Sequence, residues 1–421
     1  MKRYCYEKIR DSFLNRKKRV LLYGPPYTGK SFLLRALSEE ENVKNYILID
    51  LRIDRDFTEG LLDSLNDGRS LCDFACTFFG MKPEYVREKL FLLLDGLEPL
   101  GNAVSNLFSM ELPEHFAATT SRIDRFGIFG DKCTDTLEWI KVRGFSFYEF
   151  LDAVSEWGDG ETSYAEVLRA HFKNQKPIPE MLEEEIRELF HDYMMVGGYP
   201  EAVMQYCRNR TDLSEIRQIQ EQLFAGTKMR YINDIPEGIS ETKLAQLFEY
   251  IGNYVKDNRG AFHPGHIRRG ALAKDYVSEI DYLTSNLILH TVYESGKFHR
   301  FEVSDCGMLR YLAGDYDVFY KTDNREVLPE YFYQNYVFHV LAERDYRINI
   351  QRNSRSDYLC YTNGTLGFRH SGAGRNVSSR NKDVQNASKD EPKIYNLIDR
   401  KITQKNADHN IQYYFLEQTQ F

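Results

Sequence analysis

The feature that most constrains this chain is a glycine-rich segment near its start, which reads Gly-Pro-Pro-Tyr-Thr-Gly-Lys-Ser at 24–31. It fits the pattern G-x-x-x-x-G-K-[ST], whose backbone cradles phosphate groups. Residues 19–23 before it form a short apolar run typical of a β-strand, and 31–39 after it have leucines at helical spacing. A strand, a glycine loop and a helix in this order predict a phosphate-binding loop. The alternative, an ordinary glycine turn with a surface lysine, leaves the flanking strand and helix unexplained.

Each position of this loop has an expected contribution. Gly24 and Gly29 allow backbone torsions that a Cβ would hinder, so that successive N–H groups face phosphate oxygens at the start of the following helix. Lys30 is expected to reach the β- and γ-phosphates, and the Ser31 hydroxyl to bind Mg²⁺. We therefore expect ATP and Mg²⁺ as ligands. The predicted nucleotide-binding residues are Gly24, Pro25, Pro26, Tyr27, Thr28, Gly29, Lys30, Ser31 and Phe32.

Further apolar runs predict the parallel sheet of an α/β domain. They cover 46–51, 90–95 and 115–119, and another strand is expected at 138–142. The run at 90–95 is unbroken and ends in Asp95, as expected for a strand buried on both faces. Because strand ends converge on the ligand in such sheets, we expect Asp95 beside the loop, where it would hold Mg²⁺ as a Walker B aspartate. The alternative is a strand that simply ends at an acid.

The residue after Asp95 bears on catalysis. Many P-loop ATPases place a glutamate there to polarise the attacking water, whereas this chain has Gly96. Either Glu98 replaces the missing base, or the site binds ATP and hydrolyses it slowly. The strand at 115–119 leads to two threonines that are candidates to contact the γ-phosphate or the water. The catalytic candidates are Lys30, Asp95, Glu98, Thr119 and Thr120, and the metal candidates are Ser31 and Asp95.

Two arginines follow these threonines. Arg122 and Arg125 are candidates to place positive charge near a phosphate, within the chain or across a subunit boundary. A solvated arginine is the more common outcome at such a position. Further on, residues 145–151 read Phe-Ser-Phe-Tyr-Glu-Phe-Leu, and the spacing of Ser146 and Glu149 predicts a capping box at the start of a helix.

Taken together, the phosphate loop, the run to Asp95, the strand to Thr119 and the capping segment resemble the prokaryotic AAA-type P-loop ATPases that carry a C-terminal domain of unknown function. That family has a Gly-Gly-aromatic-Pro segment, matched here at 197–200. The resemblance implies an ATPase with a helical lid, a winged helix and a domain similar to restriction endonucleases. It departs at Gly96, where the family usually has glutamate. It covers about residues 15–345, since the motifs of the last domain are not found beyond them.

The rest of the chain predicts helices and a hairpin. Helical stripes at 244–255 and 276–287 precede an expected hairpin at 288–303, in the order of a winged helix. The expected recognition helix carries acids and no base, so DNA binding and protein packing are both open.

The expected domains are 1–151 for nucleotide binding, 152–240 for the helical lid, 241–320 for the winged-helix-like domain, 321–370 for a remnant of the last domain and 371–421 for a largely disordered or atypical tail. The predicted fold class is α/β, a P-loop NTPase with a parallel sheet flanked by helices, followed by the lid and an α+β domain.

Composition narrows the functional class. The formal charge of −8 over 421 residues argues against a general nucleic-acid or membrane polyelectrolyte but leaves a local basic face open. The odd count of seven cysteines argues against a disulfide framework, which indicates a reducing compartment. The longest apolar runs are far shorter than the ~20 residues that span a bilayer. We therefore expect a cytoplasmic protein with no membrane partner.

These patterns predict an ATP-binding AAA-type ATPase that couples Mg-ATP binding and hydrolysis to a conformational change. The alternative, which Gly96 favours, is a nucleotide-gated module that binds DNA or a partner protein through 241–320 with little or no hydrolysis. A small-molecule kinase shares the loop but not the later segments, and no Asn-Lys-x-Asp motif for guanine follows. A homo-oligomer is a further expectation, because AAA-type domains often assemble.

Overall fold

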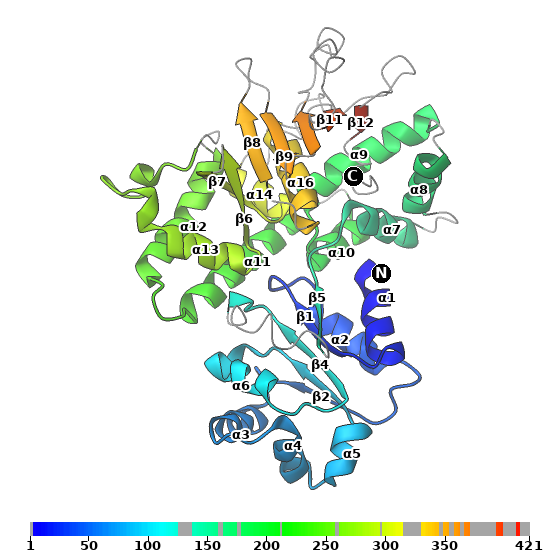
Figure 1. The fold of residues 1–421 in the computed structure, drawn as a ribbon. Coiled ribbons are helices and arrows are strands. Elements are labelled where there is room, and N and C mark those ends of the chain that lie inside the picture. The colour runs from blue at the N-terminus through cyan, green and yellow to red at the C-terminus, as the bar shows by residue number, and fades with distance from the viewer. Residues whose placement is uncertain are drawn as a thin grey trace. The chain divides into compact units, whose positions relative to one another are not determined.

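The computed structural model describes residues 3–124, 137–158, 163–174, 178–210, 213–256, 261–294, 297–314 and 330–344, and the backbone of five strands after them. It divides into two compact units (Figure 1). The first unit contains Lys2–Gly144 together with Ser285–Leu287, and the second contains the rest of the chain.

A five-stranded parallel sheet forms the centre of the first unit. Its strands are β1 (Arg19–Tyr23), β2 (Tyr46–Asp50), β3 (Phe91–Asp95), β4 (His115–Thr120) and β5 (Leu137–Lys141), in the spatial order β2-β3-β4-β1-β5. Every neighbouring pair is parallel. Each of these strands begins and ends within one residue of the limits predicted from the apolar runs. The predicted α/β fold with a parallel sheet is therefore confirmed.

Helices flank this sheet (Figure 1). They are α1 (Tyr4–Arg10), α2 (Lys30–Ser38), α3 (Arg55–Asn66), α4 (Leu71–Phe79), α5 (Pro83–Glu88) and α6 (Val104–Ser109), with a π-helical turn η1 (Asp11–Asn15) and a 3-10 turn η2 (Glu98–Ala103). In β1, Val20 and Leu22 belong to a hydrophobic core shared with α1 and α2. Leu21 belongs to another core, which contains residues of α3 to α6. Alternate residues of β1 thus belong to two cores, which explains why this strand is apolar at nearly every position.

The second unit begins with helices. They are α7 (Phe147–Trp157), α8 (Tyr164–Asn174), α9 (Glu180–Val196), α10 (Pro200–Arg208) and α11 (Leu213–Asn233). At the start of α7, the Ser146 hydroxyl accepts a hydrogen bond from the Glu149 N–H at 3.2 Å. The Glu149 carboxylate accepts one from the Ser146 N–H at 3.0 Å. The predicted capping box is therefore confirmed.

Two glycines bring the end of α9 against the start of α14 (Cys306–Ala313). A Cβ on Gly307 would lie 2.2 Å from the Val196 carbonyl oxygen, and a Cβ on Gly197 would lie 2.4 Å from Asp305 Oδ1. The buried Asp305 carboxylate accepts a hydrogen bond from the Gly198 N–H at 2.7 Å. Burial raises the pKa of Asp305, although backbone hydrogen bonds oppose the change. This close backbone packing accounts for Gly197, the first glycine of the Gly-Gly-Tyr-Pro segment, and for Gly307 opposite it.

The region predicted to be a winged helix has some of the expected elements, which are helices followed by a hairpin. Helices α12 (Glu241–Lys256) and α13 (Val277–Ser285) precede a hairpin of β6 (Leu289–Glu294) and β7 (Lys297–Val303). Between α12 and α13, the described residues form two 3-10 turns, Pro264–His266 and Ala273–Asp275, in place of a middle α-helix. The other edge of β6 pairs in parallel with β8 (Ile348–Arg352), so the hairpin belongs to a larger sheet. The winged helix therefore stays a prediction.

That sheet has the order β12-β11-β10-β9-β8-β6-β7. Its remaining elements are β9 (Tyr358–Thr362), β10 (Leu366–His370), β11 (Lys393–Ile398) and β12 (Asn410–Gln412), and α16 (Glu330–Glu343) precedes β8 in the chain. Most of the expected tail, 371–421, lies outside the described residues, although β11 and β12 fall within it. Among the helices that the structure describes, none has the length and apolar character needed to cross a membrane.

Candidate functional site

The loop between β1 and α2 has the backbone that its glycines predict. Gly24 (φ +152°), Tyr27 (φ +64°) and Gly29 (φ +90°) all have positive φ. A Cβ on Gly24 would lie 1.9 Å from the Val142 carbonyl oxygen, so only glycine allows the loop to pass the end of β5 this closely. Gly29 is the N-cap of α2 and offers no side chain to the first N–H groups of the helix. The positive end of the α2 dipole therefore faces the loop, as an anion site requires.

Side chains of the loop fold back onto its backbone. Lys30 Nζ donates to the carbonyl oxygens of Gly24 at 2.8 Å and Pro25 at 2.6 Å, and Lys30 is 6% exposed. The Thr28 hydroxyl donates to the same Pro25 oxygen at 2.9 Å. The Lys30 ammonium is thus held across the loop that the motif assigns to phosphate. Of the other predicted binding residues, Pro26 is buried, whereas Tyr27 and Phe32 are exposed.

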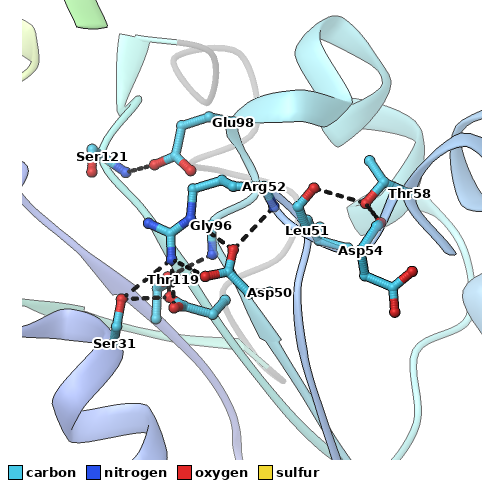
Figure 2. A network of polar contacts seen from close by, with 11 residues as sticks. Ser31, Asp50, Leu51, Arg52, Asp54, Thr58, Gly96, Glu98, Thr119 and Ser121 are labelled. Carbon is cyan, nitrogen blue, oxygen red and sulfur yellow. Dashed lines mark hydrogen bonds and ion pairs between the residues drawn. The ribbon is translucent and has the colours of Figure 1, made fainter. Parts of the chain in front are cut away.

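Three predicted residues meet at the carboxyl edge of the sheet. The Ser31 hydroxyl donates to Asp95 Oδ1 at 2.9 Å, and the Thr119 hydroxyl donates to the same oxygen at 2.5 Å. Thr119 Oγ1 also accepts the Gly96 N–H at 2.8 Å, a contact drawn in Figure 2. Strands β3 and β4 are neighbours in parallel register, with Leu94 opposite Ala118, so their last residues come together. The convergence of strand ends that the sequence predicted is therefore observed for Asp95 and Thr119.

The oxygen atoms of this cluster suit magnesium. Mg²⁺ in phosphate sites is bound through one or two carboxylates, waters and the phosphates themselves. The Ser31 hydroxyl and the Asp95 carboxylate supply such oxygens, 2.9 Å apart. Within the described part of the chain, no group of three or more His, Cys, Asp or Glu forms a self-sufficient metal cage. The donor set therefore fits an ion completed by a nucleotide.

The same cluster contains an arginine that the sequence did not reveal. Arg52, just after β2, donates from Nη2 to Asp95 Oδ2 at 2.6 Å and from Nε to Asp50 Oδ1 at 2.8 Å. A longer contact of 3.4 Å joins Nη2 to the Ser31 hydroxyl. Figure 2 shows the Arg52 guanidinium group directed at the Asp50 carboxylate and at the Ser31 hydroxyl. Burial acts to lower the pKa of Arg52, but its hydrogen bond with Asp50 and the charge of Asp95 raise that pKa above the ordinary value.

A pattern in the sequence points to this pair in hindsight. Asp50 ends β2 just as Asp95 ends β3, and the two residues are directly opposite in the parallel register. Two carboxylates side by side at one sheet edge repel each other unless a cation lies between them. Arg52 is the nearest basic residue in the chain. The repeated ending of an apolar run in aspartate was the available signal.

Gly96 leaves room for this arginine. The residue has φ +76°, and a Cβ built there would lie 2.7 Å from Arg52 Nε and 3.0 Å from its Cδ and Cζ. Any side chain at position 96 would therefore displace the Arg52 guanidinium group from its observed place. The lack of a side chain at position 96 and the position of Arg52 are thus two aspects of one arrangement.

The remaining catalytic candidates have other partners. Glu98 Oε1 accepts a hydrogen bond from the Ser121 N–H at 2.5 Å. Thr120 Oγ1 accepts the Arg122 N–H at 3.0 Å, whereas Thr119 bonds with Asp95. The structure thus brings Thr119, and not Thr120, into the Asp95 cluster by these contacts, since successive side chains of a strand point to opposite faces.

The first arginine after β4 is buried rather than solvated. Arg122 donates from Nε and Nη2 to the two carboxylate oxygens of Asp124, each at 2.9 Å, and its side chain is 4% exposed. This bidentate pair contradicts the more common, solvated outcome for this residue. Arg125, the second candidate, lies outside the described residues.

Comparisons with known proteins add the following. The sequence matches no protein-family model and no curated protein sequence. Among solved structures, the chain is similar to a Walker-type ATPase of Pyrococcus abyssi, with 14% identity, 74% of this chain and 95% of that chain covered, and a TM-score of 0.42. It is similar to a RuvB mutant of Thermotoga maritima, with 14% identity, coverages of 70% and 90% and a TM-score of 0.32. It is also similar to AMPPCP-bound DnaA of Aquifex aeolicus, with 12% identity, coverages of 66% and 86% and a TM-score of 0.27. The α/β P-loop fold of the first unit rests on its own sheet order and loop geometry.

Proposed function

We propose that this protein is an AAA-type P-loop ATPase that binds Mg-ATP in its first unit and uses its hydrolysis to drive a conformational change. The observation that carries the proposal is the meeting of the glycine loop, the N-terminus of α2 and the Ser31–Asp95 pair at one edge of the sheet. The N-terminus of a helix can bind the phosphates, and the oxygens of Ser31 and Asp95 beside it can bind Mg²⁺. A nucleoside triphosphate with its metal requires both.

The residues have separate roles in this proposal. The loop N–H groups and Lys30 bind the phosphates, while Ser31 and Asp95 hold Mg²⁺, which neutralises charge that develops on the phosphates. Thr119 orients Asp95 through its 2.5 Å hydrogen bond. Glu98 is the candidate to position the attacking water, and it would have to exchange its bond with the Ser121 N–H for that role.

Nucleotide binding is tested by titrating a fluorescent ATP analogue in the presence of Mg²⁺ against wild type and Lys30→Ala. The variant should bind at least about 100-fold more weakly, because more than one charge-assisted hydrogen bond to phosphate is lost. Lys44→Ala is the matched control, since Lys44 is an exposed lysine in the segment between α2 and β2. Failure of wild type to bind the analogue, or equal affinity of Lys30→Ala, would overturn the proposal.

The second candidate is a nucleotide-gated binding module with little or no hydrolysis. It is favoured by Gly96, which leaves the usual place of the catalytic glutamate without a carboxylate, and by the engagement of Glu98 with Ser121. Turnover of ATP by wild type and by Glu98→Gln separates the two candidates. Turnover that Glu98→Gln abolishes supports the enzyme. Binding without turnover above the Lys30→Ala background supports the module.

For either candidate, 241–320 is the proposed contact region for DNA or a partner protein. Arg268, Arg269 and Lys274 are exposed there. Arg300 on the hairpin, by contrast, is 2% exposed and pairs with Glu302 at 2.8 Å, so it is not available for phosphate contacts. ATP turnover and binding measured with and without duplex DNA test this region. A response to DNA that is lost when the three exposed basic residues are neutralised favours DNA over a protein partner.

A further inference from the structure

The Arg52 contacts coincide with the predicted magnesium ligands. Arg52 Nη2 lies 2.6 Å from Asp95 Oδ2 and 3.4 Å from the Ser31 hydroxyl oxygen. The Asp95 side chain is 10% exposed and that of Arg52 is 31% exposed, so water screens this ion pair in part. A guanidinium group is therefore bonded to the oxygens that the proposed function assigns to Mg²⁺.

A guanidinium group and a magnesium ion cannot both use these oxygens at close range. Each is a cation that needs the Asp95 carboxylate, and two cations a few ångströms apart in a partly buried site repel each other strongly. Arg52 must therefore leave Asp95 before the carboxylate can serve a metal or its water shell. Nucleotide binding with Mg²⁺ then includes the free-energy cost of breaking this ion pair.

Asp50 provides a place for the arginine to remain. It accepts from Arg52 Nε at 2.8 Å, from Nη2 at 2.8 Å and from the Arg52 backbone N–H at 3.0 Å. Arg52 can thus release Asp95 and keep its bonds to Asp50. The cost of release is then close to one charge-assisted hydrogen bond rather than the whole set.

We propose that Arg52 is an internal cation that competes with Mg²⁺ for Asp95, and that it thereby sets the magnesium concentration at which nucleotide binds tightly. Gly96 is part of this device, because a Cβ at that position would displace the guanidinium group. The proposal rests on the proposed function of the same site. It adds a role for two residues. Arg52 is the competing cation, and Gly96, at the position where the resembled family usually has glutamate, leaves room for the guanidinium group.

The direct test removes the charge of Arg52 and keeps its apolar stem. For Arg52→Met and wild type, the affinity for a fluorescent ATP analogue is measured from excess EDTA to millimolar Mg²⁺. Half-maximal tightening should occur at about tenfold lower Mg²⁺ in the variant, which corresponds to the loss of one charge-assisted competitor. Arg55→Met is the matched control, because Arg55 is an exposed arginine at the start of α3, and it should behave as wild type. An unchanged or higher magnesium requirement in Arg52→Met would overturn the proposal.

A second variant tests the same device without removing a charge. Gly96→Ala should displace Arg52 from Asp95 and lower the magnesium requirement in the same direction. The double variant should be no more affected than Arg52→Met alone, since both changes act on one contact. A second readout is the shift in melting temperature that Mg²⁺ produces in the presence of unlabelled ATP, which should reach its half-maximum at lower Mg²⁺ in both single variants than in wild type. If Arg52→Met fails to fold, an unchanged magnesium requirement in folded Gly96→Ala is sufficient to reject the proposal.

The outcomes separate this inference from the proposed function. If wild type does not bind the ATP analogue, or binds it independently of Lys30, both fail. If binding depends on Lys30 but has the same magnesium requirement in wild type, Arg52→Met and Gly96→Ala, only the competition by Arg52 is rejected.

Discussion

At the scale of single residues, Gly24 is the position at which the packing of the phosphate loop is most directly testable. The carbonyl oxygen of Val142 occupies the place where a Cβ would stand, at 1.9 Å. Gly24→Ala should therefore destabilise the first unit by about 3 kcal/mol or more, since backbone on both sides must move. Gly68→Ala is the control. It also has positive φ, +76°, but open space around it, and should lose only about 1–2 kcal/mol. Urea denaturation followed by circular dichroism measures both, and equal losses would contradict this account.

Cys72 provides a prediction that depends on pH. Burial, assisted by the charge of Glu111, raises the pKa of this thiol to about 12. The thiolate is the reactive form, so iodoacetamide at pH 8 should label the half-buried Cys76 well before the fully buried Cys72 in the folded protein. In urea both should react at similar rates. Mass spectrometry of the two labelled positions measures this, and rapid native labelling of Cys72 would refute the prediction.

The same raised pKa has a consequence for stability. The folded state keeps the Cys72 proton up to about pH 12, whereas the unfolded thiol loses it near its ordinary value. The contribution of this group is therefore fully present below that ordinary value and is lost as the pH rises toward 12. Cys72→Ala, which cannot titrate, should lose less stability than wild type over this alkaline window.

The residues of the candidate site were only partly predictable from the sequence. Lys30, Ser31 and Asp95 follow from a motif and a strand ending, and Thr119 follows from the next strand. Arg52 was missed because its contact with Asp95 depends on the register of β2 and β3. Which of Thr119 and Thr120 faces Asp95 likewise depends on the alternation within β4, and that phase is set by the packing of both cores.

At the scale of elements, the start of α7 tests whether local sequence stabilises a helix end. Ser146→Ala removes the hydroxyl that accepts the Glu149 N–H, which should cost about 1 kcal/mol. Amide exchange in the first turn of α7, measured by hydrogen–deuterium exchange, should become about fivefold faster. Glu149→Gln is the control, because an amide oxygen can still accept the Ser146 N–H and should leave exchange nearly unchanged. Unaltered exchange in Ser146→Ala would show that tertiary packing alone holds this turn.

Elements with a strong periodic or unbroken apolar pattern were predictable, and others were not. Strands β1, β3 and β4 lie inside the sheet and are buried along most of their length, so their sequences are largely apolar, whereas β5 at one edge reads Leu-Glu-Trp-Ile-Lys and is only partly buried. Strands β8 and β10 read Ile-Asn-Ile-Gln-Arg and Leu-Gly-Phe-Arg-His, which mix apolar and polar residues, and each pairs with the neighbouring β9 and also with a strand farther away in the chain. Helix α13 ends at Ser285, before the predicted end at Leu287, whose φ of +61° is incompatible with a helix.

At the scale of the whole molecule, the described residues of the two hydrophobic cores in the first unit all come from one continuous stretch of the chain. The core beside α1 and α2 runs from Ile9 to Val142, and the core beside α3 to α6 runs from Leu21 to Leu137. The loop, Asp95 and Arg52 lie in the same stretch. Because no described residue of either cluster comes from beyond Gly144, we expect the stability of this part to depend on the rest of the chain mainly through Ser285–Leu287, where Asn286 Oδ1 accepts the Ile123 N–H.

A fragment of residues 1–144 should therefore fold by itself and bind the ATP analogue in a Lys30-dependent manner. Thermal unfolding should be cooperative, since both faces of the sheet keep their helices. A fragment of residues 1–136 is the matched control. It lacks β5, which pairs with β1 from Arg19 to Tyr23, and it lacks Val142, past which Gly24 packs. Removing β5 exposes the edge of the strand that leads into the phosphate loop, so this shorter fragment should lose cooperative unfolding and nucleotide binding together. If 1–144 does not unfold cooperatively, or if 1–136 binds nucleotide equally well, the first unit does not derive its stability and its site from the five-stranded sheet.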